Sequence, residues 1–353
     1  MTREHNRSDP PRSQGISRRE FIRMAAMAGL LAGCRPVEKL VTPTSAPSPT
    51  PPPSPTAAPT IKQGRVVRTR HAGVWDGDDL VPAAIRQMLD ASITELTGLN
   101  DAAAAWAALF DPGERVAIKV NAFRNSIIWT HVPLVIAVTE CLQGVGVPAE
   151  QIVIFDYRTS ELTESGYPVN VDGPGVRCYG TDRNYTAGWE VKSTGIELSD
   201  ILLGCDALIN MPVLKVHSIA GISFAMKNHY GSFSRPDLFH NNIGKSIAQL
   251  NSLPPIKDST RLIIGDVLAA ALKQAGSWPY WEADFTGDSI LMSFDPVAHD
   301  AVGLQMLSQM LTDSGASTAA VTSLTRPCLE NGAELGLGTN DPDEMELLEV
   351  SLG

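Results

Sequence analysis

The segment from 211 to 233, MPVLKVHSIAGISFAMKNHYGSF, places side chains of catalytic type in an apolar, glycine-containing stretch. Lysine is a compact cation, and several lysines around one site hold a carboxylate or phosphate in its ionised form. Crowded lysines also lower one another's pKa, which turns one amine into a candidate base or Schiff-base nucleophile. Histidine carries protons near neutral pH. The candidate catalytic residues are therefore Lys215, His217 and Lys227.

Polar residues also follow most of the short apolar runs elsewhere in the chain. Lys119 and Asn121 end the run VAIKVN, and Asp156, Asp266 and Asp295 follow IVIF, LIIG and ILMSF. In open α/β sheets, ligands bind outside the carboxyl ends of the strands. We therefore expect these strand ends to form one mixed-charge site.

The expected substrate-binding residues come from four separate segments. They are Lys119, Asn121, Asn228, Asp266 and Asp300, with the two aspartates balancing the cations or holding a metal.

Several of these residues also have a purely structural interpretation. Asp295 precedes Pro296 and a helical pattern, as an N-cap does, and Asp266 can equally cap the segment that follows it. Asp156 fits a turn as well as a site. Lys227 lies near the end of a helical pattern that Gly231 can terminate, where its charge favours the helix dipole.

The elements that must position these side chains alternate along the chain. Apolar, β-branched runs predict buried strands at 66–69, 116–120, 152–155, 207–210, 262–265 and 290–293. Helical spacing occurs at 80–96, 132–142, 220–227, 297–311 and 327–335. Strands that are apolar on both faces and alternate with helices predict an α/β fold, a mainly parallel mixed sheet with helices on both faces.

The central segment resembles the signature of the bacterial and archaeal DUF362 family, in which P-x-x-K-x-H is followed by a glycine and by K-N-x-x-G. The corresponding residues are Pro212, Lys215, His217, Gly221, Lys227, Asn228 and Gly231. The pieces VAIKVN, IIGD, FDPVAHDAVG and AELGLG agree as well, so the resemblance extends over nearly all of 63–350. DUF362 is a domain of unknown function, and the resemblance therefore implies no particular activity.

Cofactor motifs are scarce. Some DUF362 relatives carry a ferredoxin-like cluster domain, but no C-x-x-C occurs here, so an iron–sulfur cluster is not expected and the cofactor stays unknown. A metal site is the competing hypothesis, although no short H-x-H or H-x-x-x-H spacing unites the ligand types. The candidate metal ligands are His217, His229, His240, His299, Asp266 and Asp300.

Several function classes are disfavoured by motif and charge. The glycine-rich GVGVPAE and GLGTND do not open a helix after a strand, and neither a phosphate-binding P-loop nor a G-x-S-x-G elbow is present. The net charge of −11 argues against nucleic acid, which needs a basic surface.

The first 34 residues resemble a twin-arginine export signal that ends in a bacterial lipobox. Arg18 and Arg19 precede the small apolar run 24–31, and Leu-Ala-Gly-Cys ends at Cys34. The run is shorter than the roughly 20 residues of a membrane-spanning helix, so cleavage after Gly33 is expected. The resemblance implies that Cys34 is lipidated and anchors the chain to the outer face of the cell membrane or in the periplasm.

A proline-rich tether follows the signal. The expected organisation is a signal peptide at 1–33, a Pro/Ser/Thr-rich tether at 34–61 and a DUF362-like α/β domain at 62–353. Two main hypotheses follow: an enzyme that uses a Lys/His site on a small anionic substrate or cofactor, and a non-catalytic lipoprotein that binds a small anion or metal. A third, in which the Lys/His segment is only polar scaffold, stays open.

Overall fold

The computed structural model describes residues 59–123, 126–277 and 280–353. Two compact units divide the chain, Met1–Ser54 and Pro55–Gly353, and the description concerns the second. The expected signal peptide, Cys34 and most of the tether lie outside the described residues. The domain limits of 1–33, 34–61 and 62–353 therefore stay predictions.

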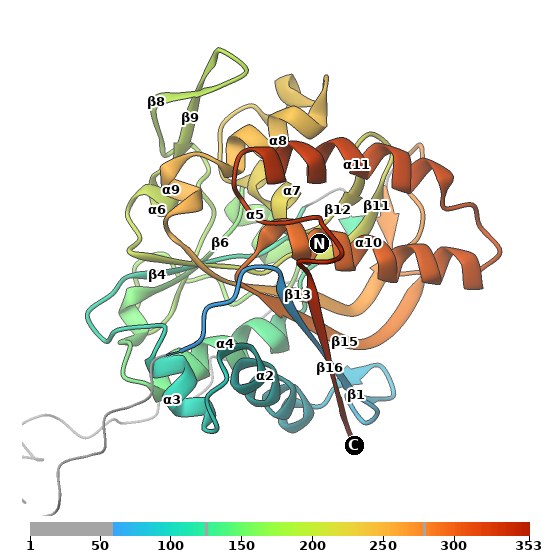
Figure 1. Ribbon diagram of the computed structural model, residues 1–353. Coiled ribbons are helices and arrows are strands. Elements are labelled where there is room, and N and C mark those ends of the chain that lie inside the picture. The colour runs from blue at the N-terminus through green and yellow to red at the C-terminus, as the bar shows by residue number, and fades with distance from the viewer. Residues whose placement is uncertain (1–58, 124–125, 278–279) are drawn as a thin grey trace, which may run out of the picture. The chain divides into compact units, whose positions relative to one another are not determined.

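A mixed sheet, ten-stranded within the described residues, forms the centre of the domain (Figure 1). Six strand pairs are parallel, and only β1–β15, β13–β15 and β11–β12 are antiparallel. The mainly parallel α/β sheet predicted from the sequence is confirmed. The main order is β16 (Glu346–Leu352), β1 (Arg65–His71), β15 (Phe285–Ser293), β13 (Thr260–Ala271), β10 (Ala207–Asn210), β4 (Val116–Lys119), β6 (Ile152–Phe155) and β7 (Arg177–Cys178), with β11 (Val213–His217) pairing β13 and β12 (Gly221–Ser223).

Helices cover both faces of this sheet (Figure 1). One face carries α2 (Pro82–Thr97), α3 (Ala102–Ala107) and α4 (Val132–Gly144), and the other carries α7 (Ala225–Asn228), α8 (Ile243–Asn251), α10 (Pro296–Asp313) and α11 (Ala319–Glu334). The shorter helices are η1 (Ala149–Gln151), α5 (Thr159–Glu164), α6 (Asp200–Leu203), η2 (His229–Gly231), η3 (Pro236–Phe239) and α9 (Pro254–Lys257).

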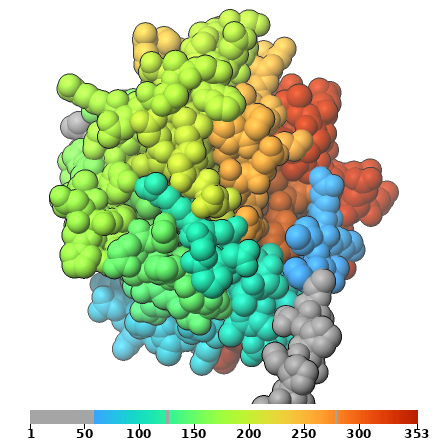
Figure 2. All heavy atoms as spheres, turned by 90° about the vertical axis from the view of Figure 1, so that its left-hand side faces the viewer, coloured from blue at the N-terminus to red at the C-terminus, as the bar shows by residue number. Residues whose placement is uncertain are grey.

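Three two-stranded units complete the domain. They are β2 (Trp75–Asp76) with β3 (Asp79–Leu80), β5 (Ser126–Ile127) with β14 (Trp281–Glu282), and the hairpin of β8 (Tyr185–Val191) and β9 (Thr194–Ser199). The hairpin stands out from the rest of the domain (Figures 1 and 2). No helix of the described part of the chain is both long and apolar enough to cross a membrane.

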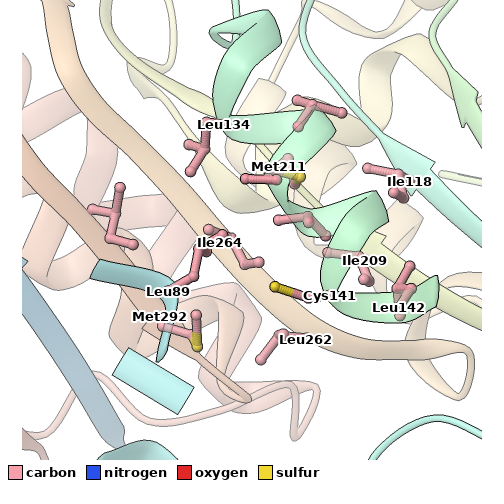
Figure 3. Close-up of a cluster of buried hydrophobic side chains, with 14 of the residues drawn as sticks. Leu89, Ile118, Leu134, Cys141, Leu142, Ile209, Met211, Leu262, Ile264 and Met292 are labelled. Carbon is pink, nitrogen blue, oxygen red and sulfur yellow. The ribbon is translucent and has the colours of Figure 1, made fainter. Parts of the chain in front are cut away.

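The central strands supply apolar side chains to both sides of the sheet. In β10, Ile209 faces the core beneath α2 and α4, whereas Leu208 faces the core on the opposite side. Figure 3 shows the first of these cores, where Leu89 and Leu134 pack with strand residues such as Ile209. Side chains alternate across a strand, so burial on both faces explains the continuous apolar runs in the sequence.

The six expected strands are all present, but two local predictions are wrong. The helix expected at 220–227 is β12 followed by the single turn of α7, because β12 pairs with β11 and tertiary pairing overrides the local pattern. The strand expected to end at Gly265 continues to Ala271 as β13. Asp266 therefore lies inside a strand and caps no helix.

Asp295 lies at the opposite edge of the sheet from the other strand ends. Because β15 runs antiparallel to β13, with Ile263 opposite Ser293, the carboxyl end of β15 lies beside the start of β13. Asp295 is the N-cap of α10 and accepts the amide hydrogens of Val297 and Ala298. The N-cap interpretation is confirmed, and the expectation that Asp295 joins a common site is wrong.

Asp295 also holds two distant segments together. Besides its cap bonds, its carboxylate accepts hydrogen bonds from the amides of Gly64 and Thr339, both at 3.0 Å. It is 1% exposed, so replacing it leaves four amide groups short of an acceptor in a dry environment.

We predict that Asp295→Ala lowers the free energy of unfolding by at least about 2 kcal/mol, more than the ~1 kcal/mol typical of an N-cap alone. Asp101→Ala is the matched control, because the exposed Asp101 caps α3 through the Ala104 amide only. Urea unfolding measures both. Equal losses in the two variants would contradict a joining role for Asp295.

Candidate functional site

A cavity of about 390 Å³ lies at the carboxyl ends of β4 and β6, beside β11. These are the strand ends at which ligands bind in open α/β sheets. The lining residues come from segments far apart in the sequence: Asn121, Phe123, Asp156, Tyr157, Arg158, Glu161, Lys215, His217, Ser223, Lys227, Asn228, Tyr230, Gly231, Pro236, His240 and Trp281.

A buried ion pair forms one wall of this cavity. The ammonium of Lys119, the last residue of β4, lies 2.7 Å from Oδ1 of Asp156, which follows β6. The amide of Ala122 donates to the other carboxylate oxygen at 2.6 Å. A side chain at Gly231 would collide with this pair, so only glycine lets η2 approach it. Asp156 is thus a site residue rather than a simple turn residue.

A chain of asparagines connects this pair to Lys215. The amide nitrogen of Asn121 donates to Oδ1 of Asn228 at 3.2 Å, and the Lys215 ammonium donates to Oδ1 of Asn121 at 2.6 Å. Asn228 also donates to the Lys119 carbonyl and to Asn210, the last residue of β10. Amide groups therefore orient Lys215 without cancelling its charge.

Lys215 and Lys227 lie in the cavity without carboxylate partners. No carboxylate of the described residues forms an ion pair with either ammonium. Lys215 is 2% exposed, and burial, followed by the charge of Lys227, lowers its pKa to about 7. Burial also lowers the pKa of Lys227 to about 8. The crowding expected from the sequence is present, and near neutral pH one amine is partly uncharged.

His217 has a different protonation state from the one expected. Burial and then the positive charge of Lys227 lower its pKa to about 2, so the ring is neutral at pH 7. Its Nδ1 accepts the amide hydrogens of Ile219 and Ala220, which leaves the ring proton on Nε2. The expectation that His217 carries a proton near neutral pH is wrong, because burial and then the charge of the nearby lysines disfavour the protonated ring.

Asp266 and Asp300 do not line the cavity. The carboxylate of Asp266 accepts hydrogen bonds from the backbone amide of His131 at 2.7 Å and lies 2.8 Å from its Nδ1. Asp300 accepts the amide hydrogens of Ala225 and Met226 and so holds the start of α7. Both carboxylates are buried and engaged in structural bonds, so neither balances the lysines as we had expected.

The four histidines considered as metal ligands lie in two different environments. His217 and His240 line the cavity, whereas His229 is buried beside Ser232 and His299 is buried beside Phe224. Within the described residues, no group of three or more His, Cys, Asp or Glu side chains could hold a metal ion.

Aromatic residues of the lining were missed by the sequence analysis. Trp281 lies on β14, in a segment without any motif, and Tyr230 lies inside the K-N-x-x-G element without having been singled out. Tyr157 directly follows Asp156 at a strand end, which was the one available signal.

Five residues of the central motif thus share one cavity with residues that follow β4 and β6: Lys215, His217, Lys227, Asn228 and Gly231. The profile of a family described as "Domain of unknown function (DUF362)" matches residues 116–305, more than half of the chain. The chain belongs to the DUF362 family. The match includes every cavity residue named above, and it is narrower than the range 63–350 over which the resemblance was noted.

Other comparisons give only distant similarity. The lactate racemase apoprotein from Thermoanaerobacterium thermosaccharolyticum is 12% identical, with a TM-score of 0.38 over 70% of this chain and 57% of that one. A crystal structure of a Thermotoga maritima protein is 10% identical, with a TM-score of 0.38 over 74% and 60%. The DUF362 chain thus spans less than two thirds of each of these structures. No curated protein matches its sequence.

The low pKa of Lys215 predicts a specific pH dependence of stability. Below pH 7 Lys215 is protonated both folded and unfolded, whereas between about 7 and the usual 10.5 the unfolded chain binds more protons. Lys215 therefore makes the free energy of unfolding rise with pH in that window, by at most about 1.4 kcal/mol per unit. Lys215→Met removes this rise. The amount by which the free energy of unfolding of the variant exceeds that of the unchanged protein should therefore shrink as pH increases.

Urea unfolding at pH 6.5, 8 and 9.5 measures this difference. Lys245→Met is the control, because Lys245 is exposed on α8. Parallel stability curves for the unchanged protein and Lys215→Met would contradict a lowered pKa for Lys215.

Proposed function

We propose that this DUF362 protein is an enzyme that binds a small organic anion in the cavity and moves a proton with the amine of Lys215. The observation that supports it is the pair of lysines enclosed in one cavity without carboxylate partners, one with a pKa of about 7. An excess of positive charge shielded from water favours an anion. An amine with a pKa near the working pH suits a general base or a nucleophile.

The two lysines have different surroundings, which suggests different roles. The Lys227 ammonium forms no side-chain hydrogen bond within the described residues, and it lies 4.4 Å from the centre of the Tyr230 ring. We assign it to holding the anion. Lys215 donates to Asn121 at 2.6 Å, so its position is fixed. A fixed amine that is partly uncharged can take a proton from a bound substrate.

The neighbouring residues support this division. His217 carries its ring proton on Nε2 and so can donate a hydrogen bond to the substrate, a positioning role that replaces the proton transfer expected from the sequence. The Lys119–Asp156 pair is internally neutral and holds the wall. We assign Asn121 and Asn228 to orienting the lysines.

We also propose that the protein is exported by the twin-arginine route and anchored to the membrane through a lipid on Cys34. The order of Arg18-Arg19, the apolar run and Leu-Ala-Gly-Cys supports this, as does the proline-rich stretch that would space the domain from the lipid. The alternative to an enzyme is a tethered lipoprotein that captures an anion unchanged. The cations favour binding in both cases, and only turnover separates them.

The enzyme hypothesis predicts separable effects for the two lysines. Native mass spectrometry and metal analysis of protein purified through its own export route identify the bound molecule, and proton exchange of that molecule into D2O measures chemistry. Lys215→Met should lower the exchange rate by about 100-fold or more, with affinity changed only a few-fold. Lys227→Met should weaken binding about tenfold or more.

The pH profile provides a second criterion for the same experiment. Exchange should rise with pH through about 7 as Lys215 loses its proton, and a bound anion shifts this rise upward. If the molecule binds but does not exchange at any pH, and if both variants weaken its binding, the enzyme hypothesis is contradicted. The hypothesis of a binding lipoprotein then remains.

The export hypothesis predicts that Arg18→Lys with Arg19→Lys keeps the precursor in the cytoplasm, whereas Arg12→Lys, outside the pair, does not. Cys34→Ser should remove the lipid, measured by intact mass and by labelling with palmitate. Cys205→Ser in the folded domain is the control. A Cys34→Ser protein that still carries the mass of the lipid would contradict the hypothesis that Cys34 is the lipidated residue.

A further inference from the structure

The cavity is rich in rings. Six of its sixteen lining residues carry an aromatic or imidazole ring. In the whole chain, Phe, Trp and Tyr together make up only 6% of the residues, and there are only 7 histidines. A cavity that only had to hold a charged group would need no such lining.

Three of these rings form a row in which neighbouring planes are stacked or moderately tilted. The His240 and His217 ring centres are 6.1 Å apart with 21° between planes, and those of His217 and Trp281 are 5.7 Å apart with 32°. Other rings meet the two ends edge-on. Tyr230 contacts His240 at 80°, and Phe123 contacts Trp281 at 74°. Roughly face-to-face and edge-to-face contacts thus alternate along these rings, as is common for aromatic pairs, and together the rings form one wall of the cavity.

The central part of this wall is held in place by the backbone. The indole N–H of Trp281 donates to the Val216 carbonyl at 2.6 Å, and Nδ1 of His217 accepts two backbone amides. Both histidines have lowered pKa values, from burial and then from Lys227, so the wall is uncharged near neutral pH. A rigid, uncharged surface of rings binds an aromatic guest without first having to be ordered.

The lysines lie beside the same rings. The Lys215 ammonium is 5.2 Å from the centre of the Trp281 ring, and Lys227 is close to Tyr230. A guest that reaches both lysines therefore lies within reach of the rings.

The volume argues against a very small acid. The cavity of about 390 Å³ falls within the ~300–1,000 Å³ typical of sites for drug-sized ligands. One water molecule takes about 30 Å³ in the liquid. An acid of a few atoms would leave most of this space to water, and the rings would have no partner.

We infer that the anion taken by this cavity is a planar aromatic or heteroaromatic acid, its charged group held by Lys227 within reach of Lys215 and its ring against the row of His240, His217 and Trp281. The inference rests on the proposed function for the anion site and adds the ring. Stacking on such a row strengthens binding by about two- to tenfold per ring pair beyond the area it buries.

Matched pairs of acids test the ring separately from the charge. Calorimetry on the mature chain compares naphthalene-2-carboxylate with decahydronaphthalene-2-carboxylate, and 2-naphthyl phosphate with decahydro-2-naphthyl phosphate. Within each pair charge and size are similar and only planarity differs. We expect the aromatic member to bind about tenfold more tightly. Which pair binds better shows whether the charged group is carboxylate or phosphate.

Two variants remove rings from the wall. Trp281→Leu and, separately, His240→Leu should bring the aromatic preference towards one while the saturated acid keeps its affinity. The second variant is needed because the first also loses the bond to Val216. Trp189→Leu, in the β8 strand of the hairpin and outside the cavity lining, should leave the preference unchanged. Lys227→Met should weaken both members of a pair equally.

The outcomes separate this inference from the proposed function. Equal binding of both members, lost in Lys227→Met, would overturn the aromatic substrate and leave the anion site intact. A preference that survives in both ring variants would overturn the role of the wall. If none of the four acids binds the unchanged protein, the proposed anion site is contradicted, and so is the inference that rests on it.

Discussion

A lysine ammonium shielded from water without an opposite charge is energetically costly, and one cavity of this domain contains two. Lys119 shows the alternative, since it lies in the same region but is paired with Asp156 at 2.7 Å. The pairing of one lysine and not of the other two leaves a local excess of positive charge. Loss of the Lys215 proton, which its lowered pKa of about 7 allows, removes part of this energetic cost. An anion bound beside the lysines would supply the missing opposite charge and remove the remaining cost.

Burial and the same excess charge together keep the two histidines of the cavity neutral. His217 and His240 are held neutral by burial and by Lys227, so they act as uncharged rings and, at Nε2 of His217, as a hydrogen-bond donor. The asparagines fit this environment for the same reason. An amide oxygen accepts from an ammonium without neutralising it, so Asn121 fixes Lys215 while the attraction for an anion is kept.

The sheet makes this arrangement possible by bringing distant segments to one edge. Strands β10, β4 and β6 are parallel neighbours, so Lys119, Asn121 and Asp156 emerge side by side at their carboxyl ends. Strand β11 pairs β13 further along the same edge and carries Lys215 and His217. Apolar side chains on both faces of these strands bury the sheet between its helix layers, which keeps this edge rigid enough to hold unpaired charges.

The fold class, the strands and the central Lys/His motif could be predicted from the sequence, because buried parallel strands leave continuous apolar runs and their carboxyl ends leave polar residues after them. An N-cap was one of two interpretations that the sequence allowed for Asp295, since Asp-Pro before a helical run is a local signal, and the structure selects it. Which strand ends meet is visible only in the folded domain. Strand direction is not encoded locally, so Asp295 went to the other edge, and Asp266, inside a strand longer than expected, bonds His131. The neutral state of His217 and the ring wall depend on burial and on charges from distant segments, which no spacing in the chain reveals.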